Sequence, residues 1–584
     1  MIYLDIVLNV PVNQSFIYSY EAPEDEKKSP EIRKRAEVKF GKLQLTGFIT
    51  CVYNDYPENC NVPKEKIRQI IRVVDDEPLF KKDLFELAQW ISKYYLCSIG
   101  EAVSAILPSG RRESSSVGFS FDTEITESSQ KNLSLEQEKA VQEILESANT
   151  EKTTYHYLYG PTGTGKTEVF LQVTDNLLKQ GKGVIYLVPE IGLTQQVIEA
   201  VIQRFGNTVA ILHSGLTQSQ KLTQWRKIMH NEARIVIGAR SAIFAPVRNL
   251  GIIIIDEEHD MSYKSDMAPR YNAKDLAKYM AEKANCPLVL GSATPEISTM
   301  YLAKENEYAL YTLTKRANNA SLPNVEIVDL RNELALGNRS MLSFKLQDEI
   351  KKNLENKKQT ILFLNRRGYS TFIMCRDCGY VAKCKNCNIS LTYHMSENKL
   401  KCHYCGFEQS TIKVCPECNS SKVKYFGTGT QKLEDEVHKL FPDASTIRMD
   451  IDTVSKKNSH EEILNKFKDE NIDILIGTQM VVKGHHFPNV TLVGVVSADS
   501  SLNLEDYRAV ERTFQTLVQV AGRAGREEYG NVIIQTYNPD HYAIIDSQKQ
   551  DYNLFYNQEV SLRKMLKYPP FCDIIMISFS GKDI

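Results

Sequence analysis

Short apolar runs that end in glycine-rich or polar turns recur along the middle of this 584-residue chain. Tyr155–Tyr159, Leu250–Ile255 and Pro287–Leu290 are such runs, and a segment with apolar residues at helical spacing follows the first. Apolar runs of this length are typical of strands buried on both faces of a parallel sheet. The pattern therefore predicts an α/β architecture in which strands alternate with helices.

The first part of the chain has a different pattern. Short alternating runs predict strands, and Lys82–Leu96 predicts a helix. Residues 1–112 are therefore expected to form a small β-rich domain. Residues 113–132 are rich in serine and glutamate, a composition that favours a flexible linker. The predicted strands are Tyr3–Val10, Ala36–Phe40 and Gly47–Val52.

The run Tyr155–Tyr159 leads directly into GPTGTGKTE, which has the spacing of a phosphate-binding P-loop between a strand and a helix. Its glycines let backbone N–H groups point at phosphates, and the positive end of the following helix adds to the attraction. We expect Lys166 to reach the β- and γ-phosphates of ATP and Thr167 to hold Mg²⁺. A glycine-rich turn that binds no nucleotide is the alternative, which the strand, the spacing and the helix disfavour. The predicted nucleotide-binding residues of this loop are Gly160, Pro161, Thr162, Gly163, Thr164, Gly165, Lys166 and Thr167.

The run Leu250–Ile255 is followed by Asp256, Glu257, Glu258 and His259, the pattern of a DExH box. The carboxylates are predicted to lie at the C-terminal edge of the sheet that carries the P-loop. We expect Asp256 in the Mg²⁺ shell and Glu257 beside the attacking water, because phosphoryl transfer depends mainly on positioning and charge neutralisation. An acidic cluster alone is usually a solvated loop, but the strand and the P-loop favour catalysis here.

Three further segments resemble motifs of superfamily 2 helicases. GSATP at Gly291–Pro295 resembles the segment that couples the nucleotide to the DNA groove, and IGTQMVVKGHHFP at Ile476–Pro488 resembles motif V. QVAGRAGR at Gln519–Arg526 resembles motif VI, whose arginines act as arginine fingers. Arg523 and Arg526 would share one face of a helix, although an ordinary basic surface pair has the same spacing. The predicted catalytic residues of the chain are Lys166, Asp256, Glu257, Gln519, Arg523 and Arg526.

These motifs imply two RecA-like α/β lobes with ATP in the cleft between them. Closure on ATP and opening after hydrolysis would alternate the grip on a nucleic-acid strand. Upstream, LSLEQEKAV at Leu133–Val141 resembles the segment in which a glutamine, here Gln137, reads the adenine edge. A surface glutamine on an amphipathic helix is the alternative for this position.

Eight cysteines between Cys375 and Cys418 form four CxxC pairs. Pairs at this spacing are typical of zinc bound by thiolates. Disulfides are the alternative, which the reducing compartment expected for a cytosolic ATPase disfavours. The first two pairs are separated by five residues, a tight link for one ion, whereas Cys387 to Cys402 leaves room for a hairpin. We therefore predict a nested arrangement, with Cys384, Cys387, Cys402 and Cys405 on one Zn²⁺ and Cys375, Cys378, Cys415 and Cys418 on the other.

The order of these features resembles the PriA replication-restart helicases, whose members are also called primosomal protein N′. The order is P-loop, DEEH, GSATP, NRRGYS, the eight-cysteine insertion, GTGTQKLEDEV, GTQMVVKGHHFP and QVAGRAGR. Ordinary superfamily 2 helicases lack the insertion, so the resemblance is specific. It implies that the N-terminal domain captures the 3′ end of a leading strand at a replication fork.

The resemblance and the patterns together predict an α/β fold class. Two RecA-like P-loop helicase lobes are expected, with an N-terminal β-rich DNA-binding domain and a zinc-ribbon insertion in lobe 2.

The sequence departs from the family pattern at two places. The linker occupies the place of a winged-helix domain, and Ile574–Phe579 resembles a strand that opens a C-terminal domain, most of which we expect to be missing. The predicted boundaries are 1–112, 113–132 for the linker, 133–315 for lobe 1, 316–371 and 423–540 for lobe 2, 372–422 for the zinc insertion and 541–584 for the truncated C-terminal domain.

The segment SYKSDMAPRYNAKD at Ser262–Asp275, directly after the DEEH box, mixes aromatic and basic residues in a predicted loop. Such a combination can stack on bases and neutralise phosphates, so we predict that it couples DNA binding to hydrolysis. A lid packed on the protein surface is the alternative. The predicted DNA-coupling residues, which include one from GARSAIFAP, are Arg240, Tyr263, Lys264, Arg270 and Tyr271.

The net charge, the lengths of the apolar runs and the chain length limit the possible classes of protein. The formal net charge of −2 excludes a globally basic nucleic-acid coat, so DNA affinity must come from local basic stripes. No apolar run is long enough to predict a membrane span. A chain of this length exceeds a single hydrophobic core.

The resemblance implies a bacterial, cytoplasmic helicase at the nucleoid that depends on ATP, Mg²⁺ and two Zn²⁺. It would translocate 3′ to 5′, recognise stalled or abandoned forks, remodel the lagging-strand arm and initiate primosome assembly. The implied partners are branched and single-stranded DNA, primosome and helicase-loader proteins, and single-stranded DNA-binding protein, with no membrane. A double-strand translocase and a recruitment scaffold that does not need hydrolysis are the alternatives.

Overall fold

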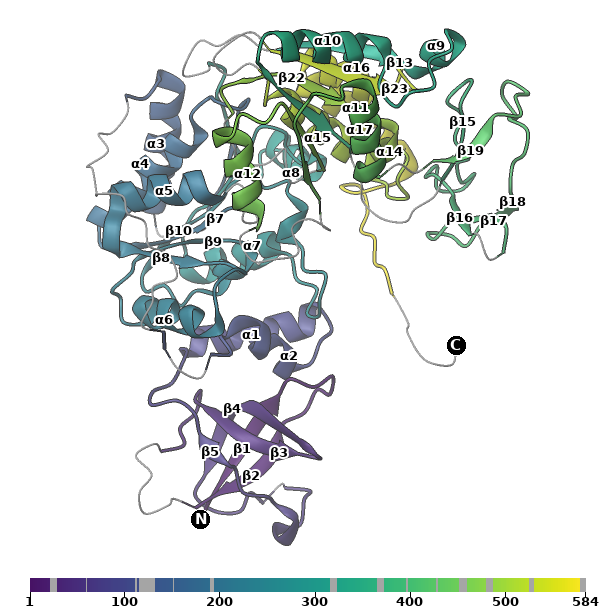
Figure 1. Cartoon of the computed structure of the whole chain (residues 1–584). Coiled ribbons are helices and arrows are strands. Elements are labelled where there is room, and N and C mark those ends of the chain that lie inside the picture. Colours follow the sequence, from purple (N-terminus) through teal and green to yellow (C-terminus); the bar gives the residue numbers. More distant parts are fainter. Residues whose placement is uncertain are drawn as a thin grey trace. The chain divides into compact units, whose positions relative to one another are not determined.

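The structure is a computed structural model of the chain. It describes residues 1–21, 29–58, 60–110, 113–114, 132–150, 152–189, 194–315, 323–364, 372–394, 397–426, 429–450, 459–478, 487–524 and 530–577. The chain divides into two units (Figure 1). The first comprises Met1–Gly160, Gly165–Ser292 and Tyr308–Leu313, and the second comprises Pro161–Thr164, Ala293–Glu307 and Thr314–Ile584.

The first unit begins with a five-stranded antiparallel sheet of order β2-β1-β4-β3-β5. Leu4, Ile6 and Leu8 alternate along the first strand and point into one core, as the period of two predicts. Two helices follow the sheet, and the second has a capping box at Ser98 and Glu101. The elements are β1 (Ile2–Leu8), β2 (Phe16–Tyr20), β3 (Arg35–Phe40), β4 (Leu43–Tyr53), the 3₁₀ turn η1 (Lys64–Lys66), β5 (Arg72–Val73), α1 (Lys82–Tyr94) and α2 (Ile99–Ile106).

The rest of the first unit is built on a seven-stranded parallel sheet of order β12-β6-β11-β10-β7-β9-β8. The apolar runs predicted as strands lie here, and their side chains are buried on both faces. The strands are β6 (Tyr155–Tyr159), β7 (Gly183–Leu187), β8 (Val209–Leu212), β9 (Ile235–Gly238), β10 (Leu250–Ile255), β11 (Leu288–Ser292) and β12 (Ala309–Thr312). The helices are α3 (Leu135–Ala148), α4 (Lys166–Lys179), α5 (Thr194–Phe205), α6 (Gln218–Met229) and α7 (Ala273–Ala284), with 3₁₀ turns η2 (Gly206–Thr208), η3 (Arg240–Phe244) and η4 (Met261–Tyr263).

A buried histidine makes this lobe sensitive to acid. His156 in β6 contacts the Tyr311 hydroxyl at 3.0 Å and Thr154 Oγ1 at 2.9 Å, and burial lowers its pKa to about 4. The unfolded chain takes up this proton near pH 6.5, so the stability contribution is complete above that pH and is lost as pH falls toward 4.

We expect the lobe to lose about 2 kcal/mol from this residue between pH 7 and pH 5. Urea unfolding of the first unit at both pH values measures it. The His156→Asn variant should show a loss smaller by that amount, and an identical pH dependence in both proteins would contradict the assignment.

The second unit contains a six-stranded parallel sheet of order β13-β23-β22-β14-β21-β20. Its strands are β13 (Asn324–Asp329), β14 (Gln359–Phe363), β20 (Thr446–Met449), β21 (Ile474–Gly477), β22 (Val490–Val495) and β23 (Asn531–Thr536). Its helices are α8 (Ile297–Lys304), α9 (Leu330–Ala335), α10 (Phe344–Glu355), α11 (Thr430–Leu440), α12 (Ser459–Asp469), α14 (Asp499–Leu502), α15 (Ala509–Ala521), α16 (Tyr542–Lys549) and α17 (Tyr552–Leu566).

A buried ionic cluster joins three helices of this unit. Arg563 of α17 contacts Glu559 at 2.8 Å and Glu511 of α15 at 2.7 Å. Glu511 also accepts the Ile297 N–H at the start of α8, at 2.7 Å. Because each charge has a partner, the cluster fixes these helices relative to one another.

The cysteine-rich insertion separates β14 from β20 and forms two small antiparallel sheets at the right of Figure 1. β15 (Phe372–Cys375) pairs with β19 (Val423–Phe426) at its base. β16 (Thr392–His394), β17 (Lys399–Lys401) and β18 (Glu408–Ser410) form the second sheet. The insertion therefore begins and ends on neighbouring strands, and the lobe sheet is continuous without it.

One predicted element is not formed. Ile574–Ile577 lie in no strand and are exposed, and residues 578–579 lie outside the described residues. A strand needs a pairing partner, and no neighbouring strand accompanies this segment in the described part of the chain. Most of the predicted linker also lies outside the described residues. Across the described residues, no helix combines the length and apolar character needed to cross a bilayer.

Candidate nucleotide-binding and metal sites

The P-loop joins β6 to α4. Gly160 N–H donates to the Ser292 carbonyl oxygen at 3.3 Å, so the loop starts beside the end of β11. Gly163 and Gly165 have φ values of 88° and 80°, a conformation that favours glycine. Lys166 is buried at the first turn of α4, where its Nζ donates to the Gly160 carbonyl at 2.7 Å. The lysine and the helix N-terminus thus provide positive charge at one place, as phosphate binding requires.

Gln137 lies next to this loop. Its side chain completes the capping box of α3, in which Oε1 accepts the Ser134 N–H at 2.7 Å. A β-carbon built on Gly165 would lie 2.3 Å from Gln137 Nε2. The structure therefore places the predicted adenine-reading residue at the P-loop and also gives it a role as a helix cap.

Asp256 follows β10 at the same sheet edge and is buried. Its Oδ1 accepts the Glu257 N–H at 2.9 Å, and its Oδ2 accepts the Tyr186 hydroxyl at 3.3 Å. Burial and the neighbouring Glu257 raise the pKa of Asp256 to about 7, although Lys166 opposes this rise. A buried carboxylate beside another carboxylate is stabilised by a cation, so the residues fit bound Mg²⁺.

Glu257 has φ of 45°, a left-handed conformation that is uncommon for a residue with a side chain. Ser292 Oγ lies 2.7 Å from His259 Nδ1 and donates to Glu257 Oε2 at 3.5 Å. Ser292 belongs to GSATP, so this hydroxyl connects the DEEH box to the segment predicted to respond to DNA. A strained residue held by such contacts is often part of a mechanism.

The interactions that hold the Glu258 side chain were not predicted from the sequence. This carboxylate is buried and accepts the Tyr157 hydroxyl at 2.9 Å and Lys274 Nζ at 2.8 Å. Both partners are distant in sequence, so no local pattern marks them. The buried pair holds the turn of the DEEH box between β6 and α7.

The two tyrosines predicted to stack on bases are buried. Tyr263 is 1% exposed and donates its hydroxyl to the Asp256 carbonyl oxygen at 2.6 Å. Tyr271 is 6% exposed and lies under the guanidinium of Arg240, 5.5 Å from the ring centroid. Base stacking by these two rings does not fit their burial, because the loop folds back on the lobe. Lys264 and Arg270 are exposed, as phosphate contact requires.

Arg240 forms hydrogen bonds to the backbone of this loop. Its Nη1 donates to the carbonyl oxygens of Ser262, at 3.0 Å, and Lys264. The arginine is half-buried and bound to the backbone of the loop. These contacts position the loop, and the part of Arg240 in DNA coupling stays a prediction.

Tyr95, which sequence reasoning also missed, ties the N-terminal domain to the same loop. Its hydroxyl donates to Asp275 at 2.8 Å and accepts the Asn272 N–H at 3.1 Å. Lys264 Nζ lies 5.3 Å from its ring centroid, and Lys264 pairs with Asn272 in a β-bridge. The Tyr95 side chain therefore contacts residues at both ends of the loop.

Helices α1 and α7 support this connection (Figure 1). Trp90 of α1 stacks on Tyr279 of α7 with centroids 4.8 Å apart. Trp225 of α6 donates its indole N–H to the Leu79 carbonyl at 2.7 Å. The N-terminal domain and the P-loop lobe are therefore joined by specific polar and aromatic contacts.

The motif VI residues lie at the end of α15. Gln519 is in its last turn, and the helix ends at Ala521 with Gly522 as its cap. Arg523 therefore follows the helix, and a face shared with Arg526 stays a prediction. Arg526 lies outside the described residues, as does most of Ile476–Pro488.

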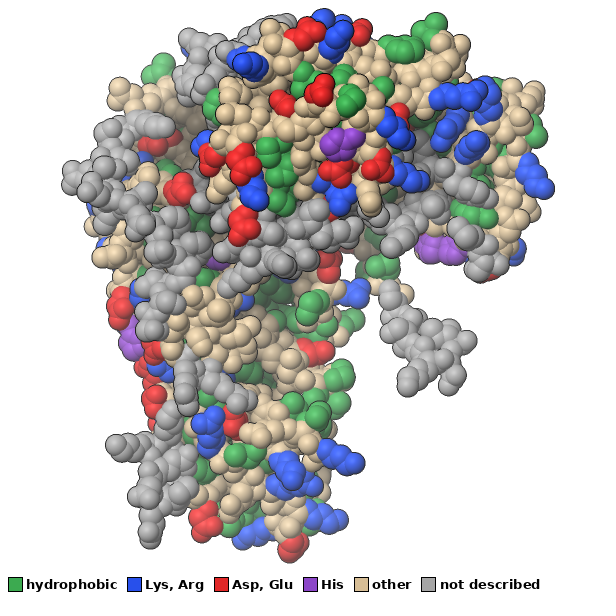
Figure 2. Space-filling view, viewed as in Figure 1, with side chains coloured by type: hydrophobic (Ala, Val, Ile, Leu, Met, Phe, Trp, Pro, Cys, Tyr) green, Lys and Arg blue, Asp and Glu red, His purple; other side chains and the backbone are tan. Residues whose placement is uncertain are grey.

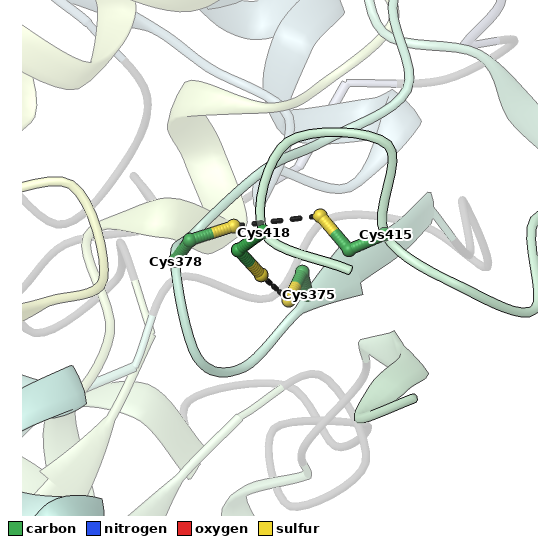
Figure 3. A group of neighbouring side chains, drawn as sticks. All are labelled: Cys375, Cys378, Cys415 and Cys418. Carbon is green, nitrogen blue, oxygen red and sulfur yellow. Dashed lines mark hydrogen bonds between the residues drawn. The ribbon is translucent and has the colours of Figure 1, made fainter. Parts of the chain in front are cut away.

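The eight cysteines come together in two groups of four with the membership that their spacing predicts. In Figure 3 the sulfurs of Cys375, Cys378, Cys415 and Cys418 point toward one another. The Sγ atoms of Cys375 and Cys418 are 3.6 Å apart, and those of Cys378 and Cys415 are 3.5 Å apart. A tetrahedron with Zn–S bonds of about 2.3 Å has edges of about 3.8 Å, whereas a disulfide is about 2.05 Å long. The groups therefore fit thiolate zinc.

Each CxxC turn has a second signal that sequence reasoning did not use. The residue after each pair is glycine or asparagine with positive φ, and its N–H donates to the carbonyl of the first cysteine of the pair. Glycine and asparagine adopt this conformation at low cost. The residues are Gly379, Asn388, Gly406 and Asn419, with φ values of 78°, 55°, 72° and 56°.

Comparison with known proteins agrees with this organisation. Four family models match, described as 3'DNA-binding domain (3'BD) at residues 5–108, DEAD/DEAH box helicase at 134–302, PriA DNA helicase Cys-rich region (CRR) domain at 384–409 and Helicase conserved C-terminal domain at 407–528. Replication restart protein PriA of Treponema pallidum (strain Nichols) is 41% identical over 582 residues, covering 99% of this chain and 87% of that protein. The chain belongs to the PriA family. This confirms the predicted resemblance.

Other PriA proteins match over different lengths. That of Haemophilus influenzae is 34% identical over 640 residues, covering 97% of this chain and 86% of that protein. That of Bacillus subtilis (strain 168) is 49% identical over 450 residues, covering 77% of this chain. The match spans 56% of the length of the Bacillus protein. As a PriA-family chain, this protein has two RecA-like lobes, a 3′ DNA-binding domain and two four-cysteine zinc sites, so the predicted fold class is confirmed.

Proposed function

We propose that this chain is an ATP-dependent DNA helicase that moves 3′ to 5′, recognises stalled or abandoned replication forks, remodels the lagging-strand arm and initiates primosome assembly. The proposal rests mainly on the hydrogen bonds of the Tyr95 hydroxyl. They connect a 3′ DNA-binding domain to the loop that follows the DEEH box. A motor whose catalytic loop is tied to a DNA-end domain can respond to the kind of DNA end it meets.

The proposed chemistry is positioning and charge neutralisation. Lys166 and the N-terminus of α4 would bind the phosphates of ATP, and Asp256 with Thr167 would hold Mg²⁺. Bound Mg²⁺ supplies positive charge to the phosphates. Glu257 would orient the attacking water, and Gln519, Arg523 and Arg526 of motif VI would contribute to hydrolysis.

The N-terminal sheet carries a cavity suited to a strand end. It has a volume of about 690 Å³ and is lined by the basic residues Lys39, Lys66 and Arg68, by the half-buried ring of Tyr53 and by the carboxylate of Asp5. Figure 2 shows lysine and arginine side chains on the visible face of this domain, with a few carboxylates among them. Cations beside aromatic rings favour a single strand.

Binding of oligonucleotides with 3′-hydroxyl and 3′-phosphate ends tests this assignment. Loss of one hydrogen bond, about 1 kcal/mol, corresponds to roughly fivefold weaker binding, and we expect at least this preference for the 3′-hydroxyl. Equal affinity for both ends would contradict recognition of the strand end.

Replacing Arg270 with alanine is expected to lower DNA-stimulated ATP hydrolysis by roughly fivefold at limiting DNA, because one phosphate contact is lost. Steady-state ATP hydrolysis at increasing DNA concentration measures the effect. Arg248→Ala is the matched control, since Arg248 is an exposed arginine of the same unit outside the loop. Equal stimulation of both variants would contradict a coupling role for Arg270.

The zinc insertion completes the proposal. Four thiolates per ion leave no coordination position for water, so a structural or recruiting role is favoured over catalysis. We propose that the partners of this chain at the nucleoid are primosome and helicase-loader proteins and single-stranded DNA-binding protein. We also propose that the domain boundaries are those predicted from the sequence.

A further inference from the structure

A second cavity lies where the N-terminal domain meets the loop after the DEEH box. Its volume is about 1100 Å³. The turn after β1, the connection from α1 to α2 and residues Ala268, Pro269 and Arg270 line it. We call it the interdomain groove. Both of its sides belong to the first unit.

The groove has the side chains that single-stranded nucleic acid requires. Lys93 and Arg270 are exposed cations on opposite sides, and Phe85 and Tyr95 provide rings. Among the described lining residues the one carboxylate is Glu101, which is engaged with the Ser98 N–H at 2.8 Å in the cap of α2. The free charge of the groove is therefore positive.

Leu96 lies at the rim of the groove. Its side chain is 91% exposed, and its φ is 52°. A leucine rarely adopts this conformation, and an exposed leucine gains nothing from solvent. Leu96 directly follows Tyr95, the C-cap of α1, and its left-handed conformation ends that helix and leaves the side chain exposed at the rim.

The two cavities of the N-terminal domain adjoin each other. Gln14 and Ser15 line both the cavity of about 690 Å³ and the interdomain groove. A strand whose end occupies the first cavity has its next nucleotides directed over these two exposed residues. The groove is the continuation of that path.

We propose that the interdomain groove is a second single-stranded DNA site, which takes the nucleotides next to a 3′ end held in the N-terminal cavity. The inference rests on the proposed recognition of a 3′ end. It adds a physical route from that end to the ATPase. The strand contacts Arg270, which belongs to the loop that Tyr95 contacts. Tyr263 of the same loop donates its hydroxyl to the Asp256 carbonyl oxygen.

Binding of two 3′-hydroxyl probes, dT2 and dT8, separates the groove from the end cavity. Lys93→Glu should weaken binding of dT8 by roughly tenfold, because it places a carboxylate beside a phosphate, and should change dT2 binding by less than about twofold. The slope of log affinity against log salt for dT8 should fall by about 0.7. Lys82→Glu is the matched control, with the same charge change at the other end of α1, at an 83% exposed side chain outside both cavities.

Each outcome decides between the two claims. Weaker dT8 binding by Lys93→Glu than by Lys82→Glu, with dT2 binding unchanged and the preference for 3′-hydroxyl over 3′-phosphate dT8 retained, supports the groove. An intact preference with equal dT8 affinity for the two lysine variants overturns the groove and leaves 3′-end recognition standing. No preference in the wild-type chain overturns both.

Photocrosslinking provides a measurement without substitutions. An oligonucleotide with 4-thiothymidine at the fourth position from a 3′-hydroxyl end should crosslink to peptides that contain residues 89–99 or 268–270. Crosslinks confined to other peptides would overturn the proposed path.

Discussion

Replacing Lys166 with alanine is expected to lower ATP turnover by about 10³-fold, the cost of removing a preorganised charge from a transition state. Lys166 is 7% exposed, and its ammonium group is already positioned, since Nζ donates to the Gly160 carbonyl oxygen within the loop. Little reorganisation is needed when phosphate binds, and water cannot replace the group. Steady-state ATP hydrolysis with saturating DNA measures the effect.

Lys179→Ala is the matched control for this prediction. Lys179 lies at the other end of α4, where its exposed side chain pairs with Asp175. Loss of an exposed pair of this kind costs little. The P-loop assignment would be contradicted if the two variants hydrolysed ATP at similar rates while both remained folded.

Zinc content is expected to fall from two ions to one per chain when a buried cysteine of either group is replaced. Cys415→Ser removes one of the four thiolates of the first group, and Cys402→Ser removes one of the second. Serine is a poor zinc ligand, and structural zinc binding of about 10–16 kcal/mol depends on the complete thiolate set. Each group has its own turns, so loss of one ion should spare the other.

Metal analysis of the purified variants tests this, with Cys51→Ser as a control because Cys51 belongs to neither group. The control should retain two ions, and a variant with one cysteine of each group replaced should retain none. Retention of both ions by Cys415→Ser would contradict the four-thiolate site. Loss of both would show that the groups are not independent.

The placement of the P-loop and the DEEH box at one sheet edge was predictable from the sequence because its signals are local. The P-loop and the DEEH box each follow an apolar strand, and parallel strands bring such segments to one sheet edge. The grouping of the cysteines followed from chain length between pairs, which limits how a short segment can wrap one ion. These predictions required no knowledge of contacts between distant residues.

The remaining features depend on distant contacts. Tyr95 is separated from Asp275 by 180 residues, and no periodicity predicts their hydrogen bond. Aromatic residues beside cations suggested base stacking at Tyr263, but the sequence does not show that its hydroxyl has a backbone partner in the protein. The end of α15 at Ala521 depends on the turn that follows it, which a helical spacing argument ignores.

The function proposed above is that of a motor whose action depends on a strand end. ATP-dependent strand displacement on synthetic forks, with and without a leading-strand 3′-hydroxyl at the junction, tests it most directly beside a Lys166→Ala control. We expect displacement that requires Lys166 and is faster when the 3′-hydroxyl is present. DNA-stimulated hydrolysis without displacement, or displacement indifferent to the strand end, would contradict it.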